Sequence, residues 1–270
     1  MNFDKIPNLI PRQKQTVDEL FKVADKYIPN REVFSFGINE FDKATDGGVR
    51  GGELITVSGM TGSGKTTFCQ WLSLNFDKIA VPSLWFSFEM NPYYLRDKFR
   101  KMGVNENLLA YSPIELISTE LKFIEEEIKE GAEDFACKII FIDHLHYLIP
   151  LQQSTNASLL IGGIIRELKK LAIKYDVIIF LIAHTKKIYQ GEKLDLSSIR
   201  DSSLVSQESD YVFLVERLKK ESGGALENKG TEWTNKTKIT LAKNRRTGDL
   251  FYITCEFKNG KYIPITKLYD

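Results

Sequence analysis

The chain has 270 residues, of which 43% are hydrophobic and 27% charged, with a formal net charge of +1. This length is sufficient for one large hydrophobic core, and the near-neutral charge excludes nucleic-acid binding through a uniformly basic surface. Three widely spaced cysteines (Cys69, Cys137 and Cys255) without a CxxC pair argue against a cysteine zinc site or a disulfide framework. With no apolar signal segment and no membrane-length apolar stretch, we expect a soluble, intracellular protein.

Residues 1–32 differ from the rest of the chain. Apolar residues between Val17 and Ile28 follow helical spacing, which predicts one amphipathic linker helix on an extended N-terminal arm. The helix would pack either on its own domain or on a neighbouring subunit, and the sequence leaves both open. We expect residues 33–270 to form the catalytic domain.

From residue 33 onward, apolar runs of strand length alternate with helical segments. Strands are predicted at residues 54–58, 83–88, 138–143, 177–183, 211–216, 238–242 and 250–257. Helices are predicted after the glycine-rich loop that follows residue 58, near Pro92, at 114–130 and at 158–175. This α/β pattern predicts a mainly parallel sheet with helices on both faces, and its last two strands predict an antiparallel hairpin at one edge.

A phosphate-binding loop is predicted where GMTGSGKT (59–66) matches GxxxxGK[ST] between a strand and a helix. Its glycines let backbone N–H groups surround phosphates, and the helix N-terminus adds partial positive charge. We expect Lys65 to reach the β- and γ-phosphates and Thr66 to ligate Mg²⁺. The residues expected to contact ATP, or a deoxynucleoside triphosphate, are Gly59, Thr61, Gly62, Ser63, Gly64, Lys65, Thr66 and Thr67.

Two acids follow predicted strands, at the end of the sheet where ligands bind in such folds. Asp143 ends the apolar run at 138–143 and is expected to hold Mg²⁺ through water. Glu89 follows the strand at 83–88 and can polarise an attacking water, although a helix cap or a surface acid fits the same pattern.

Five segments after the P-loop occur in an order that resembles the ring helicases of superfamily 4. They are SLWFSFE (83–89), IIFIDH (139–144), FLIAHTKK (180–187), SQESD (206–210) and KNRRTGD (243–249). The resemblance covers roughly residues 33–265. It is greatest to the mitochondrial helicase Twinkle and the helicase half of phage primase–helicases, and more distant to bacterial DnaB. It implies a RecA-like P-loop NTPase that works as an ATP-driven, replicative-type DNA helicase, which translocates on single-stranded DNA as a ring and hydrolyses ATP at the subunit interfaces.

The resemblance implies catalytic roles for three groups besides Lys65. Glu89 matches the glutamate that activates water, and His184 matches a sensor of the γ-phosphate. Lys243 and Arg245 match a Lys-x-Arg pair that reaches a neighbouring subunit's site, with Arg245 as the arginine finger. Arg246 is an alternative finger, since adjacent strand residues point to opposite faces. The structural alternatives are a basic hairpin turn for Lys243 and Arg245 and a buried core histidine for His184.

The resemblance also implies binding surfaces. Arg217 and Phe257 match positions that sandwich the nucleotide base, for which a surface arginine and an edge aromatic are the alternatives. The loop after the sensor strand carries basic residues expected to grip single-stranded DNA, unless it is an ordinary solvated loop. The expected DNA-binding residues are Lys186, Lys187, Lys193 and Arg200. A second loop, at 152–157, has no basic residue and is expected at most to line the channel.

The resemblance implies a homo-hexamer or a heptamer, with primase or other replisome proteins as further partners and no membrane. We expect a cytoplasmic protein that a bacterium or a phage encodes, or a protein of an organelle. The chain has no primase module and no N-terminal collar domain, so we expect a stand-alone motor, a fragment of a longer protein, or an ATPase that has lost unwinding. A RecA/RadA-like recombination ATPase and a KaiC-like regulatory ATPase share the P-loop and remain as alternatives.

Overall fold

The structure is a computed structural model. The structure describes residues 16–18, 32–104, 107–113, 115–149, 157–186, 192–199, 202–220 and 233–269. Several expectations lie outside these residues. They are the arm helix beyond residue 18, the loop at 152–156, Lys187 and Arg200.

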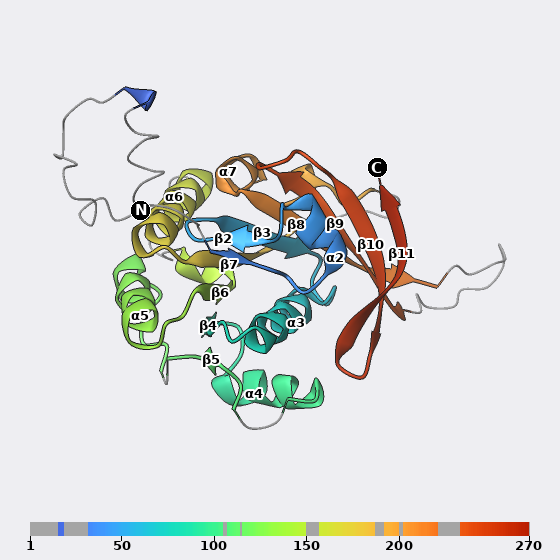
Figure 1. The fold of residues 1–270 in the computed structure, drawn as a ribbon, viewed down its shortest axis with the longest axis horizontal. Coiled ribbons are helices and arrows are strands. Elements are labelled where there is room, and N and C mark those ends of the chain that lie inside the picture. The colour runs from blue at the N-terminus through green and yellow to red at the C-terminus, as the bar shows by residue number, and fades with distance from the viewer. Residues whose placement is uncertain are drawn as a thin grey trace.

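A single large sheet organises the described residues (Figure 1). Its nine strands lie in the order β11-β10-β9-β8-β3-β7-β6-β4-β5. The strands are β3 (Leu54–Gly59), β4 (Ser83–Ser87), β5 (Ala110–Tyr111), β6 (Ile139–Asp143), β7 (Ile178–His184), β8 (Tyr211–Lys219), β9 (Trp233–Asn244), β10 (Phe251–Lys258) and β11 (Lys261–Tyr269). The six strands from β8 to β5 are parallel, and β9, β10 and β11 continue the sheet antiparallel. This confirms the predicted mainly parallel α/β fold with a C-terminal hairpin.

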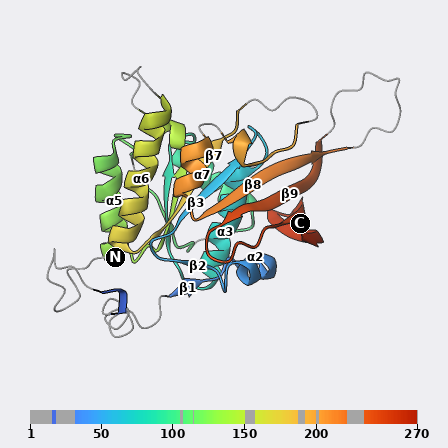
Figure 2. The ribbon, with the colours of Figure 1, turned by 90° about the horizontal axis from the view of Figure 1, so that it is seen from above.

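Helices cover both faces of the sheet (Figure 2). The helices are α2 (Asn39–Ala44), α3 (Lys65–Lys78), α4 (Pro92–Lys101), α5 (Leu121–Asp134), α6 (Ala157–Tyr175) and α7 (Ser202–Glu208), with 3-10 turns η2 (Leu145–Leu148) and η3 (Leu196–Ser198). Two short strands, β1 (Val33–Phe34) and β2 (Val49–Arg50), pair separately. Among the described helices, none has the length and apolar character needed to cross a bilayer.

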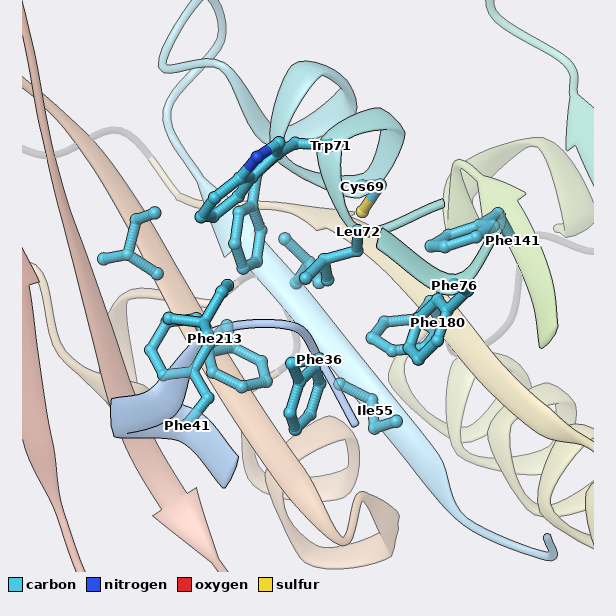
Figure 3. Close-up of a cluster of buried hydrophobic side chains, with 14 of the residues drawn as sticks. Phe36, Phe41, Ile55, Cys69, Trp71, Leu72, Phe76, Phe141, Phe180 and Phe213 are labelled. Atoms are coloured by element: carbon cyan, nitrogen blue, oxygen red, sulfur yellow. The ribbon is translucent and has the colours of Figure 1, made fainter. Parts of the chain in front are cut away.

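The central strands are buried on both sides, as their continuous apolar runs predicted. In β6, Ile139 and Phe141 join a core cluster with α3, whereas Ile140 and Ile142 join the cluster under α5 and α6. This alternation is the two-residue period of a strand. Figure 3 shows the first cluster, in which the Phe141 and Phe180 rings stack with centroids 4.9 Å apart. The two layers fix the carboxyl ends of the strands in place.

One predicted helix starts in the wrong place. The prediction began at residue 114, but α5 begins at Leu121, and the described residues before it are not helical. The Ser118 hydroxyl accepts a hydrogen bond from the Glu120 N–H at 3.0 Å, and Glu120 has an extended backbone. A local side-chain acceptor of this kind competes with the first helical turn, which periodicity alone does not register.

The C-terminal edge contains one strand more than predicted. β9 and β10 form the predicted antiparallel hairpin, and β11 pairs on the outer side of β10. Pro264 in β11 lies opposite Cys255 at a break in the register. A proline is tolerated there because the outer side of an edge strand has no hydrogen-bonding partner.

Candidate nucleotide site

The P-loop connects β3 to α3, as its sequence predicted. Gly64 is the N-cap of α3 with φ 97°, a left-handed conformation that favours glycine. A Cβ at Gly59 would lie 2.2 Å from the Val215 carbonyl oxygen, so only glycine fits there. The Lys65 ammonium donates to the Gly59 and Met60 carbonyls at 2.9 and 3.0 Å. Burial lowers the pKa of Lys65, and the charge of Asp143 partly opposes this shift.

The other P-loop residues complete the cradle. Ser63 is buried, and its hydroxyl oxygen has no hydrogen-bond partner among the described residues. Thr61 and Gly62 are exposed, and Thr67 is half-buried in the first turn of α3. The loop therefore presents polar groups that protein contacts do not satisfy, as expected of a site that binds phosphate.

The side chains of Thr66, in the first turn of α3, and Asp143, at the end of β6, meet beside the P-loop. The Thr66 hydroxyl donates to Asp143 Oδ2 at 2.7 Å, and Asp143 is fully buried at the end of β6. Burial raises the pKa of Asp143 to about 6, against the lowering effect of the Thr66 hydrogen bond. Its Oδ1 is buried without a hydrogen-bond partner. A hydroxyl beside a carboxylate with an unsatisfied oxygen suits Mg²⁺, which takes oxygen ligands and offsets the buried charge.

Glu89 lies beside this pair, together with every histidine of the chain. The Glu89 backbone N–H donates to the Asp143 carbonyl at 3.3 Å, while its carboxylate is 45% exposed. His144 Nδ1 lies 3.9 Å from Glu89 Oε2, and the rings of His144 and His184 meet edge-to-face with centroids 4.2 Å apart. Burial, together with the neighbouring His184 and His146, lowers the pKa of His144 to about 3. His144 is therefore neutral near pH 7.

The C-terminal strands approach the P-loop from the side. Tyr262 is buried, and its hydroxyl lies 3.5 Å from the Gly64 carbonyl oxygen. The half-buried Phe257 pairs with Tyr262 across β10 and β11, with ring centroids 4.9 Å apart. Burial raises the pKa of Tyr262, and nearby Arg217 opposes the shift. Arg217 is exposed on β8 and donates to the Thr234 carbonyl at 2.8 Å. Of the two predicted base-binding residues, Arg217 thus lies on β8, which pairs with β3, and Phe257 lies on β10 against the Tyr262 ring.

The predicted Lys-x-Arg pair lies at the opposite end of the sheet. Asn244, between Lys243 and Arg245, pairs with Tyr211, which is level with Ile55 near the start of β3. The P-loop leaves the other end of β3, roughly 13 Å further along the strand. Lys243 and Arg245 are therefore out of reach of phosphates bound by their own chain.

Both cations are bound within the chain. The Lys243 ammonium donates to three carbonyls at the end of α7 and just beyond it, at 2.5 to 3.1 Å. The Arg245 guanidinium donates to Asp210 at 3.0 Å and to the Gln207 carbonyl at 2.6 Å, and its side chain is 50% exposed. Asp210 also accepts from the Lys169 ammonium and the Leu54 N–H.

Arg246 has a different environment from Arg245. Its side chain is 17% exposed and donates to Glu53 and to the Thr45 and Gly48 carbonyls. Both arginines lie in the turn after β9 rather than on a strand, so the strand alternation invoked for them was wrong. The burial of Arg246 nevertheless separates it from the half-exposed Arg245.

Comparison with known proteins agrees with this architecture. A model of the DnaB-like helicase C-terminal domain family matches residues 114–263, more than half of the chain. The chain belongs to this family. It is 27% identical over 245 residues to the replicative DNA helicase DnaB of Mycoplasma pneumoniae, covering 77% of this chain and 52% of that protein. This DnaB-like chain thus spans about half the length of that relative.

A phage relative extends the likeness in sequence. The DNA helicase/primase of enterobacteria phage T3 is 22% identical over 236 residues, covering 75% of the DnaB-like chain and 40% of the phage protein. The bacterial relative has the higher identity of these two proteins, although the order of the motifs favoured a greater resemblance to phage proteins.

Solved structures agree with the fold. A DnaB-like replicative helicase, solved in a study of its interactions with primase, superposes with a TM-score of 0.75 at 17% identity. The match covers 94% of the DnaB-like chain and 68% of that helicase. A separately solved ATPase domain superposes with a TM-score of 0.77, also at 17% identity, and the match covers all of that domain. The fold is therefore that of DnaB-like ATPase domains.

Two of the predicted DNA-binding residues of the DnaB-like domain can be located. Lys186 and Lys193 are exposed beyond the carboxyl end of β7. The Lys186 N–H donates to the Ser198 carbonyl at 2.8 Å, and Asp195 caps η3. These contacts place Lys186 and residues 195–198 beyond the carboxyl end of β7, at the end of the sheet where the P-loop lies.

Three features of the DnaB-like domain were not predicted from its sequence. His144 and His146 join His184 beside the site, although their motif, DHLH, directly follows the Asp143 strand. Asp210 anchors Arg245, which the conspicuous SQESD segment could have suggested. Tyr262 touches Gly64 across 198 residues of sequence, and no local pattern signals this contact.

Proposed function

We propose that the chain is the ATP-driven motor of a replicative-type DNA helicase, which translocates on single-stranded DNA as a ring of six or seven copies. Membership of the DnaB-like family and the names of its bacterial and phage relatives support this proposal. The observation that carries it is the Thr66–Asp143 hydrogen bond beside the P-loop, because the buried Asp143 carboxylate keeps one oxygen without a hydrogen-bond partner among the described residues and so suits a cation. We place the activity in the cytoplasm of a bacterium or a phage-infected cell, or in an organelle.

Phosphate binding follows from the P-loop. Backbone N–H groups at the start of α3 would surround the phosphates, and Lys65 would exchange its two carbonyl acceptors for phosphate oxygens. Thr66 and Asp143 would hold Mg²⁺, which neutralises charge that develops on the phosphates. Arg217 and Phe257 would stack on the base from the strands beside the loop.

Glu89 is the proposed general base. Its half-exposed carboxylate would take a proton from the attacking water as the water oxygen bonds to the γ-phosphorus. The bond between that phosphorus and the β–γ bridging oxygen then breaks, which releases ADP and inorganic phosphate. His184, at the end of β7, two strands from β4 in the sheet, would contact the terminal phosphate and register its loss.

The remaining part of the site would come from a neighbouring copy. Arg245 lies at the far end of the sheet from its own P-loop and is half-exposed, so it would act as a finger in the next copy's site, with Lys243 beside it. Hydrolysis would then require the ring.

Two kinds of partner complete the proposal. Single-stranded DNA would be held through its backbone by Lys186, Lys187, Lys193 and Arg200. A primase is the proposed protein partner, because the phage relative is named as both helicase and primase and the solved DnaB-like helicase interacts with primase.

The direct test is ATP hydrolysis with and without single-stranded DNA, together with strand displacement on a forked duplex, comparing the wild type with Lys65→Ala. We expect DNA to stimulate hydrolysis, displacement to require ATP, and Lys65→Ala to lack both activities. DNA-stimulated hydrolysis without displacement would instead indicate the RecA/RadA-like recombination ATPase. Hydrolysis that ignores DNA would indicate the KaiC-like regulatory ATPase, and turnover by Lys65→Ala would refute the P-loop assignment.

A further inference from the structure

We propose that Glu89, His144 and His184 form a binding site for a transition-metal ion such as Zn²⁺, separate from the Thr66–Asp143 magnesium site. One carboxylate oxygen and one nitrogen from each imidazole all lie within 4.8 Å of one another. The chain has three histidines in 270 residues, and their rings form one cluster with centroids 4.2 to 5.9 Å apart.

The donor types favour Zn²⁺ over Mg²⁺. Mg²⁺ prefers oxygen ligands, whereas Zn²⁺ is commonly held by two imidazoles and one carboxylate with one position left open. The ligands of such a site lie about 3.4 Å apart, given bonds of about 2.1 Å. His144 Nδ1 and Glu89 Oε2 are already 3.9 Å apart. Rotation of the half-exposed Glu89 side chain can close the remaining gap.

The surroundings also suit a cation. His144 is 9% exposed, and its Nδ1 has no hydrogen-bond partner in the described part of the chain. His144 follows β6 directly and His184 ends β7. These strands are neighbours in the sheet, so their pairing positions the two residues side by side. His146 lies in the flanking turn η2, and its nitrogens are outside the set of close ligand atoms.

Occupancy of this site would inhibit the motor, a consequence that rests on the proposed function. A bound Zn²⁺ would hold the Glu89 carboxylate that activates water and the His184 imidazole that contacts the terminal phosphate. Hydrolysis would stop while nucleotide could still bind at the P-loop. Metal binding itself does not depend on that function and can be measured without nucleotide.

The test is titration of the nucleotide-free protein with Co²⁺, read by visible absorption, followed by displacement with Zn²⁺. We expect one Co²⁺ per chain with the strong band of four-coordinate cobalt, lacking sulfur-to-metal charge transfer, and persistence of the band in excess Mg²⁺. Glu89→Gln and His144→Gln should each weaken Zn²⁺ binding about 100-fold. Glu89 is exposed, so its variant tests the site even if His144→Gln folds poorly. His146→Gln is the matched control and should bind within about twofold of the wild type.

Three results would overturn the site. They are the absence of the cobalt band, a band that survives both Glu89→Gln and His144→Gln, and a loss in His146→Gln as large as in His144→Gln. Because these readouts need no ATP, failure of the metal site is distinguishable from failure of the helicase proposal. If the protein binds Zn²⁺ as expected but hydrolyses no ATP, only the proposed function fails.

Discussion

The two ends of the parallel strands differ in how their polar groups are satisfied. At the carboxyl end, Ser63 Oγ, Asp143 Oδ1 and His144 Nδ1 are buried without hydrogen-bond partners. At the amino end, the ammonium and guanidinium groups of Lys243 and Arg245 donate to carbonyls and a carboxylate of their own chain. Buried polar groups without partners are rare in proteins unless a ligand or water completes them. The carboxyl end is therefore built to receive a ligand, whereas the amino end is already satisfied.

The difference shows what each end requires for catalysis. Under the proposed function, the carboxyl end would bind nucleotide and a cation, whereas Arg245 would have to leave Asp210 before it could reach a neighbour's nucleotide. Asp210 would keep the Lys169 ammonium and the Leu54 N–H as donors after Arg245 departs. Release of Arg245 therefore leaves no buried carboxylate uncompensated, which lowers the cost of the exchange.

The largest expected effect comes from removing the half-exposed arginine. Arg245→Ala should lower kcat for ATP hydrolysis by about 10³-fold or more, because the finger stabilises charge in the transition state. Nucleotide affinity and thermal stability should change little, since Asp210 retains Lys169. Steady-state kinetics with a fluorescent-nucleotide binding assay checks both, and a variant that turns over at the wild-type rate would remove Arg245 from the site.

Arg246→Ala should have the opposite effect to Arg245→Ala, because it should lower the stability of the fold rather than kcat. Glu53 and Arg246 are 14% and 17% exposed, so the substitution leaves Glu53 largely buried without its cation. We expect a loss of about 3 kcal/mol in the free energy of unfolding. Urea denaturation measures this loss, with Arg245→Ala as the matched control. Equal stability of the two variants would mean that the environments of these arginines do not differ as described.

A smaller effect is expected at the loop beyond β7. Replacing Lys186 and Lys193 together with alanine should make the negative slope of log affinity against log salt shallower by about 1.4, since each phosphate contact to a single strand contributes about 0.7. Lys122 and Lys129, exposed on α5, provide the matched double substitution. A slope unchanged in the first variant, or one that becomes equally shallow in both, would place DNA binding elsewhere.

Much of the fold was predictable because the central strands are buried on both faces. Runs such as IIFID and IIFLIAH read directly as interior parallel strands, and the P-loop fixed the order of β3 and α3. The two-residue strands β1, β2 and β5 are too short to produce a period. β11 contains Pro264, which argues against a strand unless the strand is known to lie at an edge.

The site was predictable only where one motif carries it. The P-loop residues and Asp143 can be proposed from the sequence alone, because strand and motif coincide there. The histidine cluster depends on β6 and β7 being neighbours, which is a property of the sheet order. The position of Arg245 also depends on the sheet, since its distance from its own P-loop follows from the antiparallel pairing of β8 and β9.

We propose that the two ends of the sheet complete one site only between different copies of the chain. The most direct test co-expresses Arg245→Ala and Glu89→Gln chains under two affinity tags and purifies assemblies that contain both. Each variant alone should be inactive, but a mixed ring contains interfaces that join an intact Glu89 to an intact Arg245. We predict that mixed assemblies recover ATP hydrolysis in proportion to such interfaces. Assemblies that contain both chains and remain inactive at every ratio would contradict a site shared between copies.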